Sequence, residues 1–375
     1  MVRVLQKTAT LGPGGIQKFL INVQSNIDNN SVQFDYFLNT LEQGFFTETA
    51  LSLGSKIYGN EHNDGNPLAK LWKRYTLFYK TIKKEGYSII HIDETLEMTA
   101  ISVLVSRIAG ANVIIAHSHN DHASDKIKWY NKFIINPIAR VINSTLATDH
   151  FACSEIAAKW LFTPRLLSEN KVQIVNNGIE SKIYEYNSKI EKKYREKLGL
   201  VNSFVVGHVG RFYYQKNHKF IIEVFARILE CEPSAKLILI GEGELKEEMI
   251  RYAKKLNIIN NVIFYGVSDE VNKLIQVFDA FIFPSIFEGL GIVAVEAQAA
   301  SVQTFCAEES IAKEVDITPY CHYIPLSKGA EYWGDIILNL AKSYKKISTR
   351  HFIEQANFDI RSVAKKLKEF YMSKG

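Results

Sequence analysis

Short apolar runs alternate with amphipathic stretches along the whole chain, and this alternation limits the possible folds more than any other feature. A buried strand that is followed repeatedly by a helix is typical of a parallel β-sheet covered by helices. The first half holds six such runs, and the second half restarts the pattern at Phe204-Val-Val-Gly-His-Val-Gly210. The six runs in the first half are Arg3–Gln6, Gln33–Leu38, Ser88–Ile92, Val113–Ala116, Phe151–Cys153 and Val172–Val175. The pattern therefore predicts an α/β protein.

The length of 375 residues exceeds that of a usual single domain, so we expect two domains of similar size. Asn176-Asn-Gly-Ile179 is a turn signal, and the Lys/Glu-rich segment 181–197 follows it. We place the boundary near 180–200, with an N-terminal domain over 1–180 and a C-terminal domain over 200–358.

Composition excludes several classes of protein. Apolar residues make up 47% of the chain and the net charge is +5, which argues against disorder and against a nucleic-acid-binding surface. The four cysteines are far apart and contain no CxxC pair, as expected in a reducing compartment. The first residues look like a strand and not a signal peptide, and no apolar run approaches the roughly 20 residues of a membrane-spanning helix. We expect a cytoplasmic protein that touches a membrane at most from one side.

The stretch Phe281-Ile-Phe-Pro-Ser-Ile-Phe-Glu-Gly-Leu-Gly-Ile-Val-Ala-Val-Glu296 is the strongest functional signal. It predicts a strand, a loop broken by proline, and a helix that begins near Leu290. A continuous helix would separate Glu288 and Glu296 by about 12 Å, roughly the distance from a sugar ring to the ribose of a nucleotide-sugar. Gly289 and Gly291 leave backbone N–H groups open toward a diphosphate. The alternative is an acidic cap on an ordinary helix, and it is about equally favoured for the two glutamates alone.

Arg211 and Lys216 are the second signal. Both follow a buried strand and precede a helix that begins near Asn217, so they can form a compact cationic pocket for phosphates. Gly210 allows the backbone to turn sharply before Arg211. The alternative is a surface loop with two solvated cations.

A loop that contains Gly14 and Gly15 follows the first strand, at the edge of the sheet where ligands bind in this class of fold. It is not the glycine fingerprint of a dinucleotide-binding protein, and a tight turn without a ligand is favoured for this loop alone. The turn at Gly266 and Val267 is a weaker candidate, whose backbone groups can contact a nucleobase.

Three histidines, His117, His119 and His122, end another strand. We expect no metal there, because no cluster of carboxylates or thiolates with suitable spacing accompanies them. A neutral imidazole at this edge can instead bond a sugar hydroxyl.

A basic and aromatic helix is expected over Leu68–Tyr87, followed by a second basic segment over Lys126–Arg140. Such helices can lie on an anionic membrane. A solvated outer face over a packed apolar stripe is the favoured alternative.

Taken together, the Glu-x7-Glu spacing after Pro-Ser-x-Phe and the Gly-Arg-x4-Lys sequence resemble the retaining GT-B glycosyltransferases of family 4. The resemblance implies two facing Rossmann-like domains with a deep interdomain cleft, and a terminal helix over 359–375 that packs back on the first domain. It also implies catalysis without a metal or other cofactor, and a UDP-sugar donor.

The same resemblance implies roles for individual residues. Arg211 and Lys216 would neutralise the leaving diphosphate, Glu288 would hold donor-sugar hydroxyls, Glu296 the ribose, and His119 the sugar or the acceptor. The residues expected to bind the donor are Gly14, Gly15, Gly210, Gly266, Val267, Phe287, Gly289, Leu290, Gly291 and Glu296.

The combination of Ala-His-Ser-His-Asn with Gly-Arg-Phe-x3-Lys-Asn-His resembles bacterial capsular and exopolysaccharide glycosyltransferases. This implies a lipid-linked or oligosaccharide acceptor and a location at the inner face of the membrane. Two alternatives remain: a nucleotide-sugar epimerase of the same fold, which would need no acceptor, and a non-catalytic scaffold at the membrane.

Overall fold

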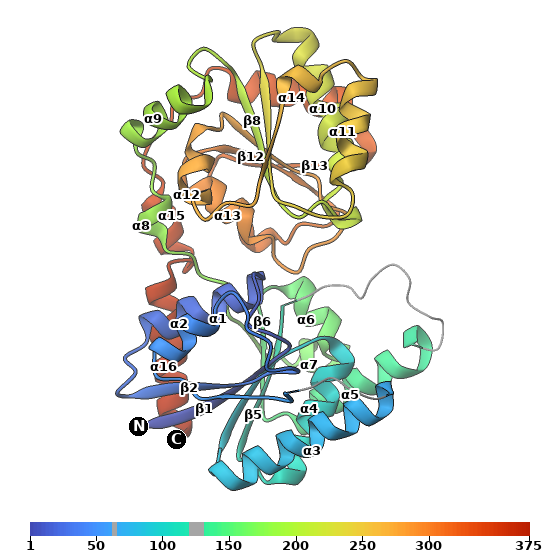
Figure 1. The fold of residues 1–375 in the computed structure, drawn as a ribbon, viewed down its shortest axis with the longest axis vertical. Coiled ribbons are helices and arrows are strands. Elements are labelled where there is room, and N and C mark those ends of the chain that lie inside the picture. Colours follow the sequence, from blue (N-terminus) through green and yellow to red (C-terminus); the bar gives the residue numbers. More distant parts are fainter. Residues whose placement is uncertain (62–65, 120–130) are drawn as a thin grey trace. The chain divides into compact units, whose positions relative to one another are not determined.

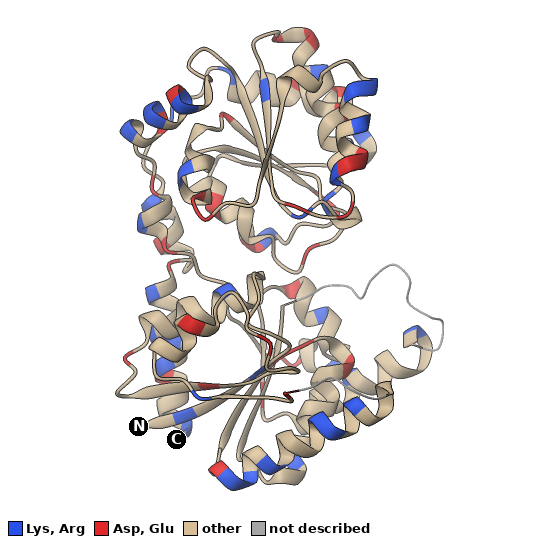
Figure 2. Cartoon of the chain, in the orientation of Figure 1, with Lys and Arg blue, Asp and Glu red and all other residues tan. Residues whose placement is uncertain are grey.

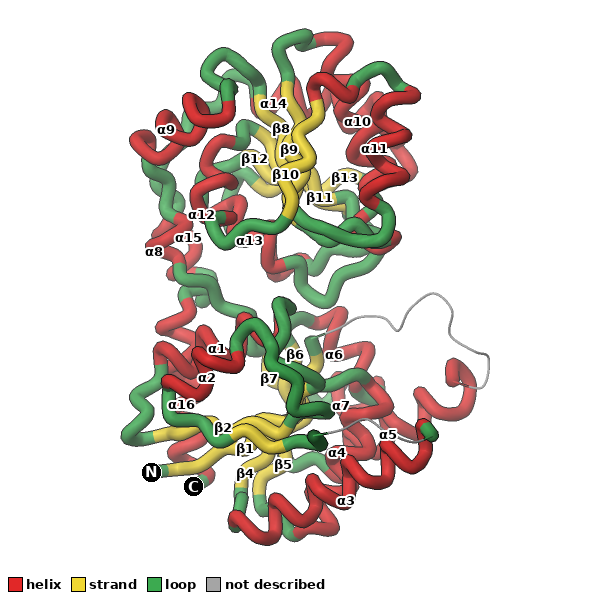
Figure 3. Tube along the Cα trace, viewed as in Figure 1, coloured by secondary structure: helices red, strands yellow, loops and turns green. Residues whose placement is uncertain are grey.

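Each apolar run that was predicted as a strand lies in one of two parallel β-sheets. The computed structural model describes residues 1–61, 66–119 and 131–375. The chain folds into two compact units: unit 1 comprises Met1–Ile179 and Asp359–Gly375, and unit 2 comprises Glu180–Phe358. In both units the strands lie in the middle and helices surround them (Figure 1, Figure 3). The predicted α/β fold with two parallel-sheet domains is confirmed.

The sheet of unit 1 has the strand order β3-β2-β1-β4-β5-β6-β7. Its strands are β1 (Val2–Thr8), β2 (Val32–Phe37), β3 (Ile57–Tyr58), β4 (Ile89–Asp93), β5 (Val113–Ser118), β6 (Asp149–Ala152) and β7 (Val172–Ile174). The main helices are α1 (Gly15–Asn26), α2 (Thr47–Ser52), α3 (Pro67–Glu85), α4 (Leu96–Ala109), α5 (Asn136–Leu146), α6 (Glu155–Leu161), α7 (Pro164–Ser168) and α16 (Ile360–Lys374), and a π-helical turn spans Asn131–Ile135.

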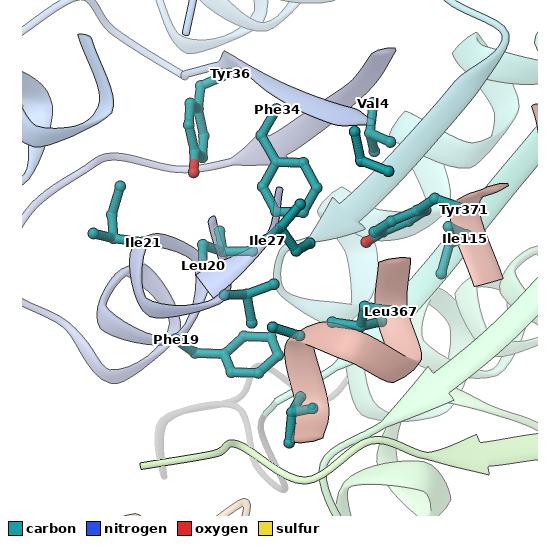
Figure 4. Close-up of a cluster of buried hydrophobic side chains, with 14 of the residues drawn as sticks. Val4, Phe19, Leu20, Ile21, Ile27, Phe34, Tyr36, Ile115, Leu367 and Tyr371 are labelled. Carbon is teal, nitrogen blue, oxygen red and sulfur yellow. The ribbon is translucent and has the colours of Figure 1, made fainter. Parts of the chain in front are cut away.

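The C-terminal helix α16 completes the core of unit 1. Figure 4 shows side chains of α1, the central strands and α16 in one cluster, with Leu367 and Tyr371 among them. The helix begins as predicted, because the Asp359 carboxylate caps it by accepting from the backbone N–H of Arg361 at 3.0 Å. Asp359 also forms a parallel bridge with Ile179, so the segment that leaves unit 2 is fixed beside the end of the first segment of unit 1.

The sheet of unit 2 has the order β10-β9-β8-β11-β12-β13. Its strands are β8 (Val205–Val209), β9 (Lys236–Ile240), β10 (Val262–Gly266), β11 (Ala280–Phe283), β12 (Gln303–Ala307) and β13 (Cys321–Ile324). The helices are α8 (Ser181–Tyr184), α9 (Ser188–Leu198), α10 (His218–Cys231), α11 (Lys246–Lys255), α12 (Val271–Leu274), α13 (Ile292–Ala299), α14 (Gly329–Ala341) and α15 (Arg350–Gln355).

Two details differ from the sequence-based expectations. The strands β3 and β13 were not predicted, and α13 begins at Ile292 instead of near Leu290. Gly291 precedes this helix with φ of +90°, a left-handed conformation that favours glycine, and this turn delays the helix. The 12 Å estimate between Glu288 and Glu296 assumed a continuous helix, so its premise is wrong.

Candidate functional site

The loops that follow β8, β9 and β10 in unit 2 are hydrogen-bonded to one another through their backbones. The N–H of Gly210 donates to Ile240 at 2.9 Å, and the N–H of Gly241 donates to Gly266 at 2.9 Å. A Cβ on Gly241 would lie 2.2 Å from the carbonyl oxygen of Gly210, so only glycine allows this approach. The carboxyl ends of the three strands therefore form one continuous backbone surface that includes Gly210 and Gly266. Val267, the residue after Gly266, is 77% exposed.

Lys216 and Glu288 form an ion pair next to this surface, with Nζ and Oε1 2.5 Å apart. Their side chains are only 16% and 10% exposed. The ammonium group also lies 5.0 Å from the centre of the Phe283 ring. The structure thus brings together the two charged residues that sequence analysis took from separate motifs.

Two amide side chains that sequence analysis did not single out hold this pair in place. Gln215 donates from its side chain to the carbonyl of Phe287 at 2.9 Å, and its own backbone carbonyl accepts from the N–H of Ile286 at 2.8 Å. Asn217 donates to the carbonyl of Pro284 at 3.2 Å. The loop before α10 and the loop before α13 are therefore joined along their length.

Arg211 lies in the same loop but is exposed, and its guanidinium stacks 4.8 Å from the centre of the Tyr213 ring. Leu290 is buried and Phe287 is half-buried, and the expected contacts of this segment with a donor stay predictions. Gly291 cannot carry a side chain there, because a Cβ would lie 2.7 Å from the Phe283 ring.

Glu296 lies inside α13 and is 3% exposed. The hydroxyl of Tyr184 in α8 donates to Glu296 Oε1 at 2.7 Å. Burial, followed by the neighbouring carboxylate, raises the pKa of Tyr184 well above its ordinary value, so the phenol stays protonated. Tyr184 belongs to the segment that was interpreted as a connection between domains, and for this reason it was missed.

In unit 1, the Gly14–Gly15 turn leads directly into α1. Gly14 is the N-cap of α1. Because glycine has no side chain, it does not cap or cover the first N–H groups of the helix. A Cβ on Gly14 would lie 2.2 Å from the side chain of Gln17, whereas one on Gly15 would meet nothing within 4 Å. The turn is shaped as a helix N-terminus that can accept an anion.

His117 and His119 point to the same side, as strand alternation predicts, and their ring centres are 3.9 Å apart. The side chain of His119 is only 1% exposed, its Nε2 lies 2.8 Å from Asp93 Oδ1, and the Phe19 ring is 5.5 Å away. The predicted contact between His119 and a sugar stays a prediction. His122 lies outside the described residues.

Asp93 and His91, which sequence analysis did not select, meet these histidines. Sequence analysis noted no cluster of carboxylates or thiolates with suitable spacing, and the carboxylate that meets the histidines, Asp93, comes from the adjacent strand β4. Burial would raise the pKa of the Asp93 carboxyl, but the imidazoles of His91, His117 and His119 outweigh it and hold this pKa well below its ordinary value. Burial also lowers the pKa of His117 to about 3. Among the described residues, His91, Asp93 and His117 form a group that can hold a metal ion.

A buried ion pair lies at the same edge of the sheet. Lys7 of β1 and Glu94, which follows β4, are 2.7 Å apart and almost completely buried. Asn39 and Ser102 complete the hydrogen bonding of the two charged groups. This pair was also missed, because nothing in the local sequence marks Lys7 as buried.

Helix α3 forms where the basic and aromatic helix was predicted. Leu68 and Trp72 are 79% and 72% exposed, and a groove of about 810 Å³ lies between α3 and α4. The groove is lined by Asn66, Leu68, Ala69, Leu71, Trp72, Tyr75, Thr76, Tyr79, Val105 and Ile108. Part of the second basic segment, residues 126–130, lies outside the described residues. In the part of the chain that is described, no helix is long and apolar enough to cross a membrane.

Comparison with known proteins gives a consistent picture. Residues 190–320 match the family described as glycosyl transferases group 1. The chain is 28% identical over 357 residues to the putative glycosyltransferase EpsF of Bacillus subtilis, covering 94% of this chain and 91% of that protein. It is 28% identical over 383 residues to the capsular polysaccharide biosynthesis glycosyltransferase CapH of Staphylococcus aureus, covering 100% of this chain and 99% of that protein.

A further relative and two solved structures are also glycosyltransferases or similar in fold to this chain. Over 249 residues, covering 63% of this chain and 61% of the relative, the chain is 27% identical to an Escherichia coli UDP-Gal:alpha-D-GlcNAc-diphosphoundecaprenol alpha-1,3-galactosyltransferase. Among solved structures, Anabaena Alr3699/HepE in complex with UDP-glucose superposes with a TM-score of 0.79 at 19% identity, covering all of both chains. WaaG, a glycosyltransferase involved in lipopolysaccharide biosynthesis, gives a TM-score of 0.72 at 14% identity, covering 98% of this chain and 99% of that one.

Proposed function

We propose that this chain, which belongs to the group 1 glycosyltransferases and has the GT-B fold, transfers a sugar from a UDP-sugar to a lipid-linked acceptor during synthesis of a bacterial surface polysaccharide. The observation that carries the proposal is the ion pair of Lys216 and Glu288, held between two loops at the carboxyl ends of the strands of unit 2. A cation that is already fixed in this position needs little rearrangement to meet a diphosphate.

In the proposed reaction, an acceptor hydroxyl oxygen forms a bond to the anomeric carbon while the bond from that carbon to the diphosphate breaks. The acceptor proton goes to the departing phosphate, and the configuration at the anomeric carbon is retained. Lys216 and Arg211 stabilise the charge that develops on the diphosphate. In unit 1, the N–H groups at Gly14 and Gly15 are proposed to bind an anionic group of the donor.

Positioning of the donor falls to the remaining residues. Glu288 binds sugar hydroxyls, and the buried carboxylate of Glu296 binds the ribose, oriented by the Tyr184 hydroxyl. The backbone of Gly266 and Val267 contacts the base. For His119 we propose contact with the sugar or the acceptor, and its ring packs on Phe19 of α1, the helix that begins at Gly15.

Uridine is proposed as the base because the solved structures of similar fold include complexes with UDP and UDP-glucose. A polyprenyl diphosphate sugar is proposed as the acceptor, because relatives from Escherichia coli and Campylobacter jejuni are named for such acceptors. Both names describe those proteins, and for this chain they define the first substrates to test.

The test is a panel of UDP-sugars incubated with and without undecaprenyl-diphosphate-linked GlcNAc or GalNAc. We expect UDP release that depends on the acceptor, and a product whose anomeric proton coupling in NMR matches the configuration of the donor. Conversion of a UDP-sugar to its epimer without acceptor would favour an epimerase instead. Inversion at the anomeric carbon would contradict the proposed mechanism but not the transfer.

We also propose that unit 1 meets an anionic membrane through the outer surface of α3, α4 and α5, here called the basic apolar face. These helices are neighbours, and α3 alone carries six Lys or Arg residues and one acid (Figure 2). The exposed apolar side chains of the basic apolar face include Leu68 and Trp72 of α3, Ile108 of α4 and Ile138 of α5. Cations beside exposed apolar groups match the chemistry of an anionic lipid surface.

Cosedimentation with vesicles tests this face. Replacing Lys80, Lys83 and Lys84 by serine should weaken binding to phosphatidylglycerol vesicles about 100-fold, from roughly 1 kcal/mol for each cation. The triple change Arg251→Ser, Lys254→Ser and Lys255→Ser on the exposed surface of α11 in unit 2 is the matched control and should have little effect. An equal loss of binding to phosphatidylglycerol vesicles in both variants would contradict the proposal. So would equal binding of the unmodified protein to phosphatidylcholine and phosphatidylglycerol vesicles.

A further inference from the structure

Strands β4 and β5 of unit 1 bring three metal-binding side chains to one buried point. His91 and Asp93 are two residues apart on β4, so strand alternation places them on the same face of the sheet. Strand β5 pairs with β4 in parallel, with Ile92 opposite Ala116, and His117 follows Ala116 directly. The exposed fraction of each of the three side chains is 1% or less.

The spacing of the three facing atoms suits a metal ion. His91 Nε2 and His117 Nδ1 are 3.0 Å apart, His117 Nδ1 and Asp93 Oδ1 are 3.4 Å apart, and His91 Nε2 and Asp93 Oδ1 are 3.8 Å apart. Ligands at 2.0–2.1 Å from a tetrahedral Zn²⁺ lie about 3.4 Å from one another. The three observed distances lie on both sides of this value, so an ion fits between the atoms with shifts of a few tenths of an ångström.

Charge gives an independent reason for a cation at this point. A buried carboxylate is normally paired with a cation or bound to a metal. Among the described residues, the basic side chains within 4 Å of the Asp93 carboxylate are the imidazoles of His91, His117 and His119. The nearby ammonium of Lys7 is engaged by Glu94 and Asn39.

Asp93 also retains bonding capacity. Among the described residues, its Oδ2 has no hydrogen-bond partner although it is buried. This oxygen can bind the same ion as Oδ1, so the carboxylate can supply two ligand atoms. The set of ligands is then two imidazole nitrogens and one carboxylate, donors that zinc accepts readily.

Residues around the three ligands hold them in the required orientation. His91 Nδ1 lies 2.5 Å from the hydroxyl of Tyr371 in α16. When Nδ1–H donates a hydrogen bond to this hydroxyl, the lone pair of Nε2 is directed toward Asp93 and His117. His119 Nε2 lies 2.8 Å from Asp93 Oδ1 and can donate to it. Such hydrogen bonds to ligands commonly fix the tautomer and the ring orientation at metal sites.

From this geometry we propose that His91, Asp93 and His117 bind a structural Zn²⁺ ion. The ion joins the carboxyl ends of β4 and β5 and, through His91 and Tyr371, fixes the C-terminal helix α16 to the sheet. The site is closed, and the ion has no part in the proposed sugar transfer, so the inference does not depend on that function. It departs from the expectation, made from sequence, that the histidines bind no metal.

Elemental analysis of the intact protein tests the site. The protein is produced in zinc-supplemented medium and purified without a metal-affinity column. We expect inductively coupled plasma mass spectrometry to give about one zinc ion per chain. Replacement of the ion by Co²⁺ should give the visible absorption of a four-coordinate site. Less than about 0.1 metal ion per chain, with no change in the melting temperature on adding Zn²⁺, would overturn the proposal.

The variants Asp93→Asn and Asp35→Asn separate the site from general damage to unit 1. Asp35 is also a buried carboxylate of this unit, but it is paired with Arg3 at 2.8 Å. We expect Asp35→Asn to keep the metal and Asp93→Asn to lose it. If Asp93→Asn retains a full equivalent of metal per chain, the assignment of the ligands is wrong. If this variant does not fold, the cobalt spectrum of the unmodified protein decides.

Discussion

Lys216 is the residue on which the account depends most. Its ammonium group is nearly buried and is balanced by Glu288, and Gly210 packs against its methylene groups, where a Cβ would lie 3.2 Å away. A side chain confined in this way presents its charge at one place. Lys219 of α10, in contrast, has a side chain that is 61% exposed.

We predict that Lys216→Ala lowers kcat by about 100- to 1,000-fold, the usual effect of removing one preorganised group that stabilises charge in a transition state. Lys219→Ala is the matched control, because Lys219 lies three residues later with a side chain that is 61% exposed. Steady-state kinetics of UDP release would measure both. Full activity of Lys216→Ala would disprove the assigned role.

The Tyr184 hydroxyl is predicted to position Glu296 for the donor. Tyr184→Phe removes a buried hydrogen bond of 2.7 Å, which should cost about 1 kcal/mol of stability and raise the Kd for UDP several-fold. Isothermal titration with UDP measures the affinity, and urea unfolding measures the stability. An unchanged Kd would mean that Tyr184 only stabilises α13.

Among the elements, α16 illustrates how a terminal segment can determine the stability of a distant part of the chain. Leu367 is 3% exposed and lies in the core of unit 1, whereas Met372 of the same helix is 48% exposed. Leu367→Ala should therefore destabilise the protein by about 2–5 kcal/mol, and Met372→Ala should change stability very little. Urea unfolding measures the free energy of unfolding of both variants, and a comparable decrease in the two would contradict this placement of the helix.

The packing between β8 and α10 predicts how stability depends on pH. The His218 ring stacks on Phe212 with centres 4.1 Å apart, and burial, with a smaller effect of Lys216, lowers the pKa of His218 to about 3. An unfolded histidine has a pKa of about 6.5, so below that pH the unfolded state binds more protons and stability falls as the pH falls.

His218→Phe should reduce the loss of stability between pH 7 and pH 5 by up to about 2 kcal/mol. Urea unfolding at the two pH values measures this, with His351→Phe on the exposed surface of α15 as the control. A loss of stability that is the same in His218→Phe and in the unmodified protein would contradict the neutral, buried state of His218.

Elements also show what the sequence could and could not predict. The central strands were predictable because each contains a short run of apolar residues, although β1 and β4 also carry buried polar side chains. In contrast, β3 has only two residues and β13 is mostly half-buried, so neither gives a clear apolar run. The start of α13 was misplaced because Gly291 takes a left-handed conformation that sequence does not specify.

The same reasoning applies to the candidate site. Arg211, Lys216, Glu288 and Glu296 were selected as candidates because each belongs to a recognisable local spacing. Tyr184, Gln215, Asp93 and His91 were missed because their roles come from contacts between segments that are distant in sequence. Strand pairing sets the contacts of His91 and Asp93, and packing of helices and loops sets those of Tyr184 and Gln215, and no short motif encodes either.

At the scale of the whole molecule, the features of the two units differ. The family match, residues 190–320, lies entirely in unit 2, which holds the Lys216–Glu288 pair. Unit 1 holds the Gly14–Gly15 turn and the basic apolar face, and α3 alone has a charge of +5, equal to the net charge of the whole chain. The proposed function assigns the donor to unit 2 and the acceptor to unit 1.

The most direct test of the central claim is transfer of a radiolabelled sugar from UDP to an undecaprenyl-diphosphate-linked monosaccharide. Labelled lipid is extracted after incubation with the unmodified protein, Lys216→Ala or Lys219→Ala. We predict labelled lipid with at least one UDP-sugar for the unmodified protein and for Lys219→Ala, and almost none for Lys216→Ala. Transfer of comparable extent by all three proteins, or transfer from GDP-sugars alone, would contradict the account.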